Sequence, residues 1–339
     1  MKKLLKELCH LNGISGNEDV VREYIISKVK DNCEYKVDNI GNLICFCKGK
    51  KSSDKKLMIA AHMDEVGGIV TYIREDGSLC FDQVGGVNTT SFLGKQVIVG
   101  YDDLYGVVGS KAVHNLSADE REAVPKYENL YIDIGSSLRE GSKMCVRPGY
   151  PVNFVSEFTE FGRNCIRSKA IDDRAGCAMM IKLINEKPEY DTYFVFNVQE
   201  EVGLRGAKVS ANSVMPDFAI VLEATTACDI PGVPEEKQVC ALGKGPVVSY
   251  MDKSTIYDRE LYDLAYEIAL DNGIRFQTKS MIAGGNDSGA IHVSGNGVRT
   301  LAVSVPCRYI HSPSCVINYL DLEDSLDLVR RLIRRIHTL

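Results

Sequence analysis

The sequence predicts an α/β protein: an open central sheet flanked by helices, with a small β-rich insert in mid-chain. Strand-like and helix-like patterns alternate before residue 66 and again after residue 163, which is typical of an α/β sheet. Between those points, 98 of the 339 residues hold 13 of the 29 glycines, a density that indicates many turns. We therefore expect one α/β domain made of residues 1–65 and 164–339, interrupted by a β-rich domain at 66–163.

The N-terminal part, residues 1–65, begins with a helix signal and continues as two strands. Ser15 followed three residues later by Glu18 is the pattern of a capping box, and apolar residues at helical spacing follow it. Continuous apolar runs at 43–47 and 57–61 predict buried strands, and the second leads directly into His62. Cys45 and Cys47 share one face of the first strand, where we interpret them as reduced core thiols.

The insert, residues 66–163, carries short runs rich in β-branched residues between its glycines. The runs at 96–99 and 105–108 are examples. Short strands separated by turn residues predict a compact, barrel-like β domain.

The C-terminal part, residues 164–339, returns to the alternation of strands and helices. We expect helices at 175–187, 204–213, 260–271 and 322–337, and strands at 193–198, 218–222 and 300–305. The last helix is amphipathic, with its apolar residues at helical spacing on one face.

Composition excludes several classes of protein. Lys and Arg total 40 against 46 Asp and Glu, a formal net charge of −6, so the chain lacks the basic character of a nucleic-acid binder. No apolar run approaches the roughly 20 residues that cross a bilayer, and the charged N-terminus lacks the apolar core of a secretory signal. The 12 cysteines are too sparse for a disulfide scaffold. We therefore expect a cytoplasmic protein without nucleic-acid or membrane partners.

Polar residues cluster where the predicted strands end. In open α/β sheets, ligands bind outside the carboxyl ends of the strands, so residues at these positions are candidates for function. Together with an acidic pair that precedes the helix at 175, they are His62, Asp64, Asp172, Asp173, Glu200, Glu201, Glu223 and His311. Imidazole and carboxylate ligands without cysteine fit Zn²⁺, Co²⁺ or Mn²⁺.

This set is sufficient for a hydrolytic centre with two metal ions. Two ions roughly 3.5–4 Å apart are close enough to share a carboxylate, and another carboxylate must stay free as the general base for the attacking water. The spacing of His62 and Asp64 also allows the carboxylate to orient the imidazole ring. From the residues alone we infer a metallohydrolase, and the roles of the adjacent acids Glu200 and Glu201 stay open.

Six segments along the chain carry a more specific similarity. They are GISGNE at 13–18, DNIGNL at 38–43, AHMDEVG at 61–67, SKAIDDRAG at 168–176, QEEVGLRGA at 199–207 and RYIHSP at 308–313. In these segments and their order the chain resembles the dinuclear metallo-aminopeptidases of the tetrahedral (TET), glutamyl-aminopeptidase or cellulase-M-like family. The resemblance implies a zinc-aminopeptidase-like fold with a mixed central sheet. It also implies an enzyme that removes N-terminal residues from peptides.

The resemblance further implies which residues hold metal. His62, Asp172 and Glu223 would hold one divalent ion. Asp172, Glu201 and His311 would hold a second, so that Asp172 bridges the two. Two ions per subunit are implied, with Zn²⁺ as the first choice and Co²⁺ or Mn²⁺ as the others.

In the same comparison, Glu200 would be the general base and Asp64 would orient the first histidine. Two positions depart from the family pattern. The family commonly has Asp where Glu223 stands, which leaves the metal preference open. It usually has Thr at the position of Asn286, in a loop that continues to Asp287 and that we expect near the substrate.

The position of the insert also fits this family. Similar proteins carry a β-rich domain there that mediates assembly, with dimers built into a hollow tetrahedral dodecamer. We therefore expect residues 66–163 to make the protein a homo-oligomer whose enclosed sites admit short or unfolded peptides. His114, within the insert, is expected at the surface.

Two alternatives to a peptidase stay open on the sequence. An endoglucanase-like glycoside hydrolase could use the paired carboxylates, although that chemistry gives the histidines no role. A catalytically inactive homologue could serve as a scaffold, although every expected ligand is present. The preferred N-terminal residue is not specified, because a pocket for acidic residues needs a basic side chain and Arg205, Arg308 and Lys244 cannot be placed.

Overall fold

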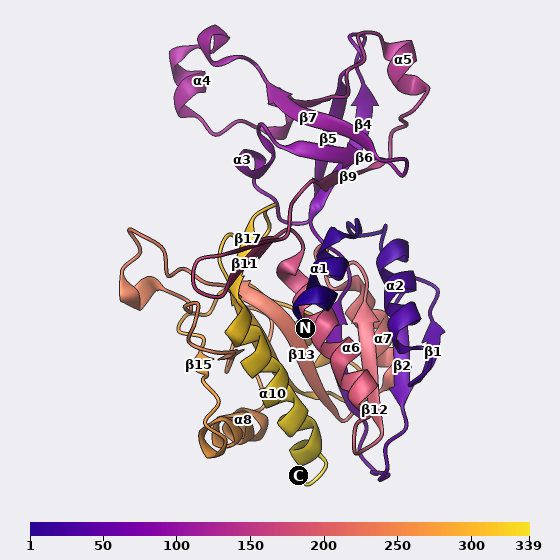
Figure 1. Ribbon diagram of the computed structural model, residues 1–339, viewed down its shortest axis with the longest axis vertical. Coiled ribbons are helices and arrows are strands. Elements are labelled where there is room, and N and C mark those ends of the chain that lie inside the picture. The colour runs from indigo at the N-terminus through magenta and orange to yellow at the C-terminus, as the bar shows by residue number, and fades with distance from the viewer.

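The computed structural model describes residues 1–339 as two parts that meet at one end of a sheet (Figure 1). The α/β part holds both chain termini, and a β-barrel formed by the middle of the chain stands above it in this view. The predicted fold class, a mixed sheet flanked by helices with an inserted barrel-like β domain, is confirmed.

The α/β part is built on an eight-stranded mixed sheet in the order β1-β2-β12-β3-β13-β16-β14-β15. The strands are β1 (Glu34–Val37), β2 (Leu43–Cys47), β3 (Leu57–His62), β12 (Thr192–Asn197), β13 (Phe218–Thr226), β14 (Val247–Val248), β15 (Gln277–Thr278) and β16 (Arg299–Cys307). The central strands β12, β3, β13 and β16 are parallel, whereas β2 is antiparallel to both of its neighbours. The parallel strands are almost wholly buried, as expected for strands covered on both faces.

The strand predicted at 218–222 was too short. β13 continues to Thr226 because residues 223–226 keep pairing with β16, where Glu223 lies opposite Ser304. Glu223 therefore lies within a strand rather than directly after it. The other predicted strands of the sheet are found within two residues of their expected ends.

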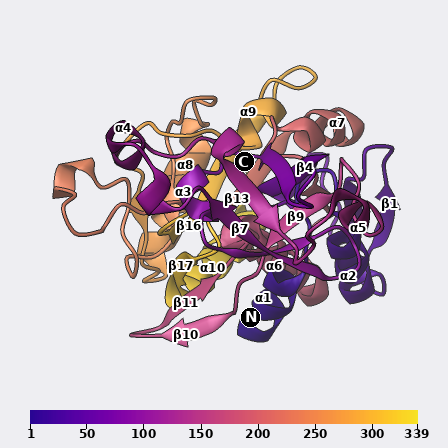
Figure 2. The ribbon, with the colours of Figure 1, turned by 90° about the horizontal axis from the view of Figure 1, so that it is seen from above.

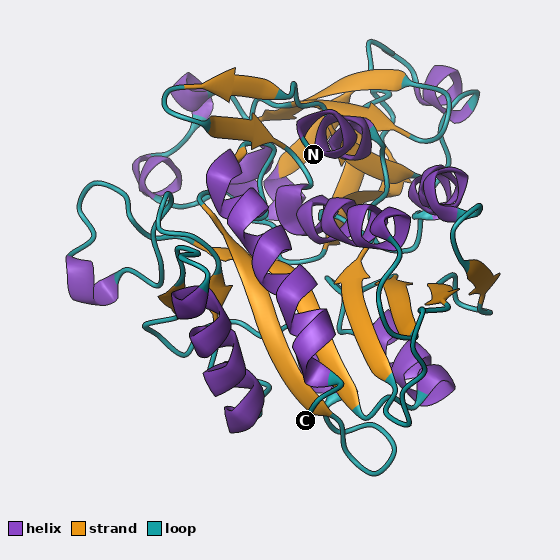
Figure 3. Ribbon diagram, turned by 60° about the horizontal axis from the view of Figure 1, so that its bottom comes forward, coloured by secondary structure: helices purple, strands orange, loops and turns teal.

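Helices cover both faces of the sheet (Figure 3). One face carries α1 (Lys2–His10), α2 (Asp19–Val29), α6 (Ile171–Glu186), α8 (Arg259–Asp271) and α10 (Tyr319–Ile336), and the other carries α7 (Arg205–Val214) and α9 (Ser288–Ile291). Successive side chains of a strand point to opposite faces, so Ile59 of β3 joins the first core and Met58 joins the second. None of the helices combines the length and the apolar character that a membrane span requires.

The helix predicted at 175–187 begins four residues earlier than expected. α6 starts at Ile171, but Asp172 and Asp173 have non-helical backbone angles, and regular helix begins only after them. Asp172 and Asp173 therefore form a non-helical turn that carries two adjacent carboxyl groups at the start of α6.

The middle of the chain forms a closed barrel in the order β4-β5-β8-β7-β6-β9. Its strands are β4 (Gly67–Ile73), β5 (Leu79–Val84), β6 (Gln96–Val99), β7 (Leu104–Ser110), β8 (Leu130–Asp133) and β9 (Pro151–Phe154), connected through α3 (Thr89–Phe92), η1 (Val113–Asn115), α4 (Ala118–Glu122), η2 (Tyr127–Asn129) and α5 (Arg139–Lys143). The barrel encloses a hydrophobic core of its own, separate from the cores of the α/β part. Closure of the barrel removes exposed sheet edges.

A small antiparallel sheet at the junction of the two parts was not predicted. It consists of β10 (Thr159–Phe161), β11 (Cys165–Ser168) and β17 (Cys315–Asn318), which lie beside one another at one margin of the molecule in Figure 2. The exposed residues of β10 lack the apolar pattern of a buried strand. A further 3₁₀ turn, η3 (Glu235–Lys237), lies in the loop after β13.

Candidate metal centre

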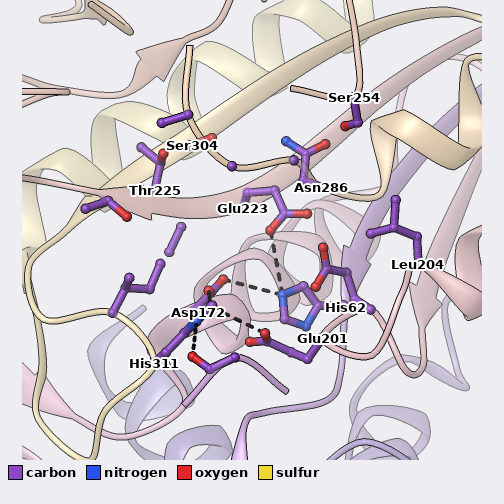
Figure 4. A pocket seen from close by; sticks show the side chains of 18 of the residues that line it. His62, Asp172, Glu201, Leu204, Glu223, Thr225, Ser254, Asn286, Ser304 and His311 are labelled. Atoms are coloured by element: carbon purple, nitrogen blue, oxygen red, sulfur yellow. Dashed lines mark hydrogen bonds and ion pairs between the residues drawn. The ribbon is translucent and has the colours of Figure 1, made fainter. Parts of the chain in front are cut away.

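His62 is the last residue of β3, and its ring is buried at the carboxyl end of the sheet (Figure 4). Nδ1 lies 3.1 Å from the backbone oxygen of Asp64. Because a carbonyl can only accept, this nitrogen carries the proton. Nε2 faces two carboxylates, 3.4 Å from Oδ1 of Asp172 and 3.6 Å from Oε2 of Glu223. Metal-binding histidines commonly donate a hydrogen bond from one ring nitrogen and bind the metal through the other. The ring of His62 is held in this way, with Nε2 free to bind a metal.

His311 repeats this arrangement from the loop between β16 and β17. Its Nδ1 donates to the backbone oxygen of Gly86 at 3.0 Å, in the turn that follows β5 of the barrel. Its Nε2 lies 3.5 Å from Oδ2 of Asp172 and 3.3 Å from Oε2 of Glu201. Asp172 thus turns one oxygen toward each histidine. The backbone of His311 is left-handed, with φ 57°, a conformation that costs energy for a residue with a Cβ and clusters at functional sites.

These contacts form two triads that share one carboxylate. In each triad the ligand atoms lie within 4.8 Å of one another: His62, Asp172 and Glu223 in the first, and Asp172, Glu201 and His311 in the second. Oδ1 of Asp172 and Oε1 of Glu223 are buried without a hydrogen-bond partner, which is unusual because buried polar atoms are almost always paired. A divalent cation between the rings and the carboxylates would supply that partner, so the residues present fit such an ion.

The charges of the two triads perturb one another strongly. Burial opposes ionisation of Asp172, but His311 and His62 hold the pKa of this carboxyl well below its usual range. Burial also opposes the charging of His311, yet Asp172 and Glu201 raise the pKa of the ring to about 10. Burial raises the pKa of Glu201 to about 7. Protons therefore occupy this cluster in the absence of a cation, and a bound metal ion must displace them.

Asp64 contacts more than the histidine that it was predicted to orient. One carboxylate oxygen lies 3.4 Å from Nδ1 of His62. The carboxylate also accepts the backbone N–H groups of Glu200 and Glu201, at 3.0 and 3.1 Å, and the hydroxyl of Ser15 at 2.6 Å. Asp64 therefore fixes the turn that carries both acids relative to the end of β3.

The capping box predicted from Ser15 and Glu18 is wrong. Ser15 donates to Asp64, whereas the carboxylate of Glu18 accepts the backbone N–H groups of Gly16 and Gln199. No side chain caps the start of α2. Both side chains instead stabilise the loop at residues 199–201: Glu18 directly, and Ser15 through Asp64. These tertiary hydrogen bonds replace those of the predicted capping box.

The two triads open into a cavity of about 500 Å³. The predicted loop at 284–286 forms part of its wall, and the hydroxyl and amide groups that line it belong to Thr225, Thr226, Ser254, Asn286 and Ser304. Asp287 lies outside the lining; it is fully buried and accepts a hydrogen bond from Asn197 at 2.7 Å. Glu200 and Glu201 both line the cavity, and burial raises the pKa of Glu200 well above its usual range.

Lys279 also lines the cavity, although no motif or periodic pattern in the sequence indicates it. No other Lys or Arg does so: Arg205 and Lys244 are exposed elsewhere, and Arg308 pairs with an aspartate outside the cavity. The ammonium group of Lys279 donates to the backbone oxygen of Ala283 at 2.6 Å, and its side chain is buried. It directly follows β15, a two-residue strand without an apolar run that could have marked it. His114, by contrast, is exposed on the barrel as expected.

The geometry of this centre agrees with the comparisons with known proteins. Residues 41–328 match the family described as M42 glutamyl aminopeptidase. The chain belongs to this family. A putative aminopeptidase of Acetivibrio thermocellus is 40% identical to this M42 protein over 333 residues, which cover 97% of each chain.

Solved structures show the same relationship. A TET aminopeptidase from Thaumarchaeota archaeon SCGC AB-539-E09 superposes with a TM-score of 0.94 at 33% identity, over 98% of this chain and 96% of that one. The TET1 peptidase of Pyrococcus horikoshii, which can assemble into a tetrahedron or a large octahedral shell, has a TM-score of 0.86 at 35% identity over 98% of both chains. The predicted family is confirmed. This M42 protein is a metal-dependent aminopeptidase, a hydrolase of peptide bonds.

Proposed function

We propose that this M42 aminopeptidase works with two divalent metal ions per chain, Zn²⁺ first among them and Co²⁺ or Mn²⁺ as the others. His62, Asp172 and Glu223 would hold one ion, and Asp172, Glu201 and His311 the other. The observation that supports this assignment is the shared carboxylate of Asp172, which turns one oxygen toward Nε2 of each histidine. The Nδ1 atoms of His62 and His311 are hydrogen-bonded to backbone carbonyl groups. Their Nε2 atoms are therefore available to bind metal.

The proposed chemistry is attack of water on the first peptide bond of a substrate. When bound, divalent ions would supply Lewis-acid chemistry, which polarises a scissile carbonyl and lowers the pKa of water. Glu200 accepts a proton from the attacking water and passes it to the leaving amine. Burial raises the pKa of Glu200, which moves it from the ordinary carboxyl range toward the operating pH, where a general acid–base group works best. Asp64 holds the backbone of Glu200 in place.

Measurement of bound metal tests the assignment. Protein stripped of metal with a chelator should be inactive. When metal is added back, it should bind two ions per chain as activity returns. His62→Ala and His311→Ala should each take up one ion fewer, whereas His114→Ala, a change at an exposed histidine, should take up two. Activity in metal-free protein, or full uptake in both ligand variants, would contradict the proposal.

We also propose that the cavity prefers peptides whose first residue is acidic. Lys279 is the one lysine or arginine in its lining. An ammonium group has three donors, and the protein satisfies one of them through Ala283. Because a partly desolvated cation gains from a carboxylate partner, a Glu or Asp side chain of the substrate would complete its hydrogen bonds.

Finally, we propose that residues 66–163 form an oligomerisation domain, while 1–65 and 164–339 form the catalytic domain. The barrel has its own hydrophobic core, and large apolar side chains stay exposed on it: Tyr72, Tyr105, Val107, Val113 and Val124. Where such groups are contiguous they mark a protein interface. Dimers assembled into a tetrahedral dodecamer would place the sites inside a shell; PhTET1 is seen as a dodecamer, and the TET1 peptidase can assemble into a tetrahedron. Light scattering of the intact protein would measure the number of chains.

A further inference from the structure

Three cysteines gather at the edge of the large sheet, outside the metal centre. Cys33 lies in the turn between α2 and β1, and Cys45 and Cys47 lie on β2. β1 and β2 are antiparallel, with Glu34 opposite Phe46. One further step along this register sets Cys33 opposite Cys47, with Cys45 one diagonal position away.

All three thiols belong to the same face of the sheet. Cys45 and Cys47 are 0% and 1% exposed within the main core, and the partly buried Cys33 packs against that core. The Sγ atom of Cys33 lies 3.4 Å from the backbone oxygen of Val29, the last residue of α2. The register and the shared face therefore place the three cysteines in one cluster, with Cys33 nearest to Cys47.

The cluster has one reactive member and two partners. The neighbouring thiols of Cys45 and Cys47 lower the pKa of the Cys33 thiol, whereas the pKa values of the two buried thiols are raised. Cys33 is also the one of the three that solvent reaches, and the thiolate is the nucleophilic form of cysteine. Directly opposite residues of an antiparallel pair have Cα atoms about 4.5–5.5 Å apart, within the range of roughly 4.4–6.8 Å that disulfides span.

We propose that Cys33, Cys45 and Cys47 form an oxidant-sensitive thiol site, in which a hydroperoxide oxidises Cys33 and a buried neighbour closes a disulfide. The Cys33 thiolate attacks hydrogen peroxide, the O–O bond breaks, hydroxide leaves and a sulfenic acid remains. The thiol of Cys47 or Cys45 then attacks that sulfur, the S–S bond forms, and the S–O bond breaks with release of water. The cysteine pair loses two electrons to the peroxide, and a dithiol reductant reverses the change.

The site is independent of the proposed two-metal function. Cys47 and Leu57, the first residue of β3, both pair with Thr192 at the start of β12. His62 lies at the opposite end of β3, where it pairs with Asn197. The disulfide would tie the turn before β1, the exposed edge strand, to its buried neighbour β2. We therefore expect oxidation to raise the thermal midpoint of the protein and to leave peptidase activity unchanged.

The test is oxidation of the intact protein with a small excess of hydrogen peroxide, followed by alkylation of the remaining thiols. Two of the 12 thiols should disappear, and mass spectrometry of a tryptic digest should find the peptide 31–36 linked to the peptide 37–48. Cys33→Ser should abolish the link. Cys145→Ser, at the exposed cysteine of the barrel, is the matched control and should keep it.

Two further variants separate the steps. Cys45→Ser and Cys47→Ser each leave one partner, so at least one of the two should still form the link. In the double variant the Cys33 sulfenic acid should persist and be trapped by dimedone. The proposal is overturned if the wild-type protein shows no link between these peptides, or if Cys33→Ser loses the same two thiols as the wild type.

Discussion

The ammonium nitrogen of Lys169 lies 2.6 Å from Oε1 of Glu65, and both side chains are buried. The same oxygen accepts the backbone N–H of Gly13 and lies 3.7 Å from Nη2 of Arg174. Lys169 precedes Asp172 by three residues and Arg174 follows it by two. This buried cluster therefore ties both sides of the Asp172 segment to the chain that leaves β3.

Lys169→Met should destabilise the protein by about 3–5 kcal/mol, because it leaves the carboxylate of Glu65 buried without its main partner. Urea unfolding of the metal-free protein would measure this loss. A second variant that also carries Glu65→Leu should lose less than the sum of the two single changes, since it removes both charges together. A single variant within about 1 kcal/mol of the wild type, as for an exposed pair, would show that the ion pair does not support the segment.

Glu200→Gln should lower turnover of peptide substrates by roughly 10²–10⁴-fold, the usual contribution of a general acid–base group. The amide keeps the shape of the side chain but cannot accept the proton of the attacking water. Metal content, measured by mass spectrometry on the same sample, should be unchanged. Parallel assays on cello-oligosaccharides should show no hydrolysis by either protein. Near-normal peptidase activity in the variant would assign the base to another residue.

Metal binding should release protons and strengthen as the pH rises. The pKa of His311 is raised to about 10 in the metal-free protein, whereas a metal ligand must be a neutral imidazole. Calorimetric titration at pH 7, in buffers of different ionisation enthalpy, should detect this release. His311→Ala should release fewer protons than His114→Ala, the control. A proton release equal in these two variants would refute the ionisation assigned to His311.

The same ion pairs predict how the metal-free fold responds to pH. Because the pKa of His311 is raised on folding, its contribution to the free energy of unfolding is complete below the unfolded pKa of roughly 6.5. It is lost as the pH rises through about 10. Denaturant unfolding of chelated protein should therefore show a decline over this interval that is smaller in His311→Ala. Equal declines in wild type and variant would contradict the prediction.

Lys279→Met should remove the preference for an acidic first residue. A hydrogen bond to a charged group contributes about 1.5–3 kcal/mol, so kcat/KM for an N-terminal Glu substrate, relative to Leu, should fall roughly 10- to 150-fold. Lys244→Met, which changes an exposed lysine, should leave that ratio as it is. Wild-type enzyme that treats both substrates alike would show that Lys279 does not select the substrate.

The parts of the fold that follow from local pattern could be predicted from the sequence. The run at 43–47 is buried along nearly its whole length and matches β2 at both ends. The residues selected at strand ends, such as His62, and in the acidic pair of the first turn of α6, such as Asp172, do come together. The prediction of the site is correct because the carboxyl ends of parallel strands lie at the same edge of the sheet.

Contacts between segments far apart in the chain could not be predicted in this way. Glu18 has the spacing of a helix cap, yet its carboxylate binds the backbone of Gln199, 181 residues away. Lys279 lines the cavity because the loop after β15 folds over it, and no periodic pattern precedes that loop. Local propensity weighs little against the hydrogen bonds that a buried site must satisfy.

The hydrogen bond from His311 to the backbone of Gly86 makes the barrel a structural participant in the reaction centre. Gly86 belongs to the chain that returns from β5, so the orientation of this imidazole depends on how the barrel is seated against the α/β part. A chimaera that exchanges residues 66–163 for another module must bring a carbonyl back to the same place, or it will leave the histidine free to rotate. Any displacement of the barrel would then be transmitted to the second triad through the backbone of the turn that follows β5.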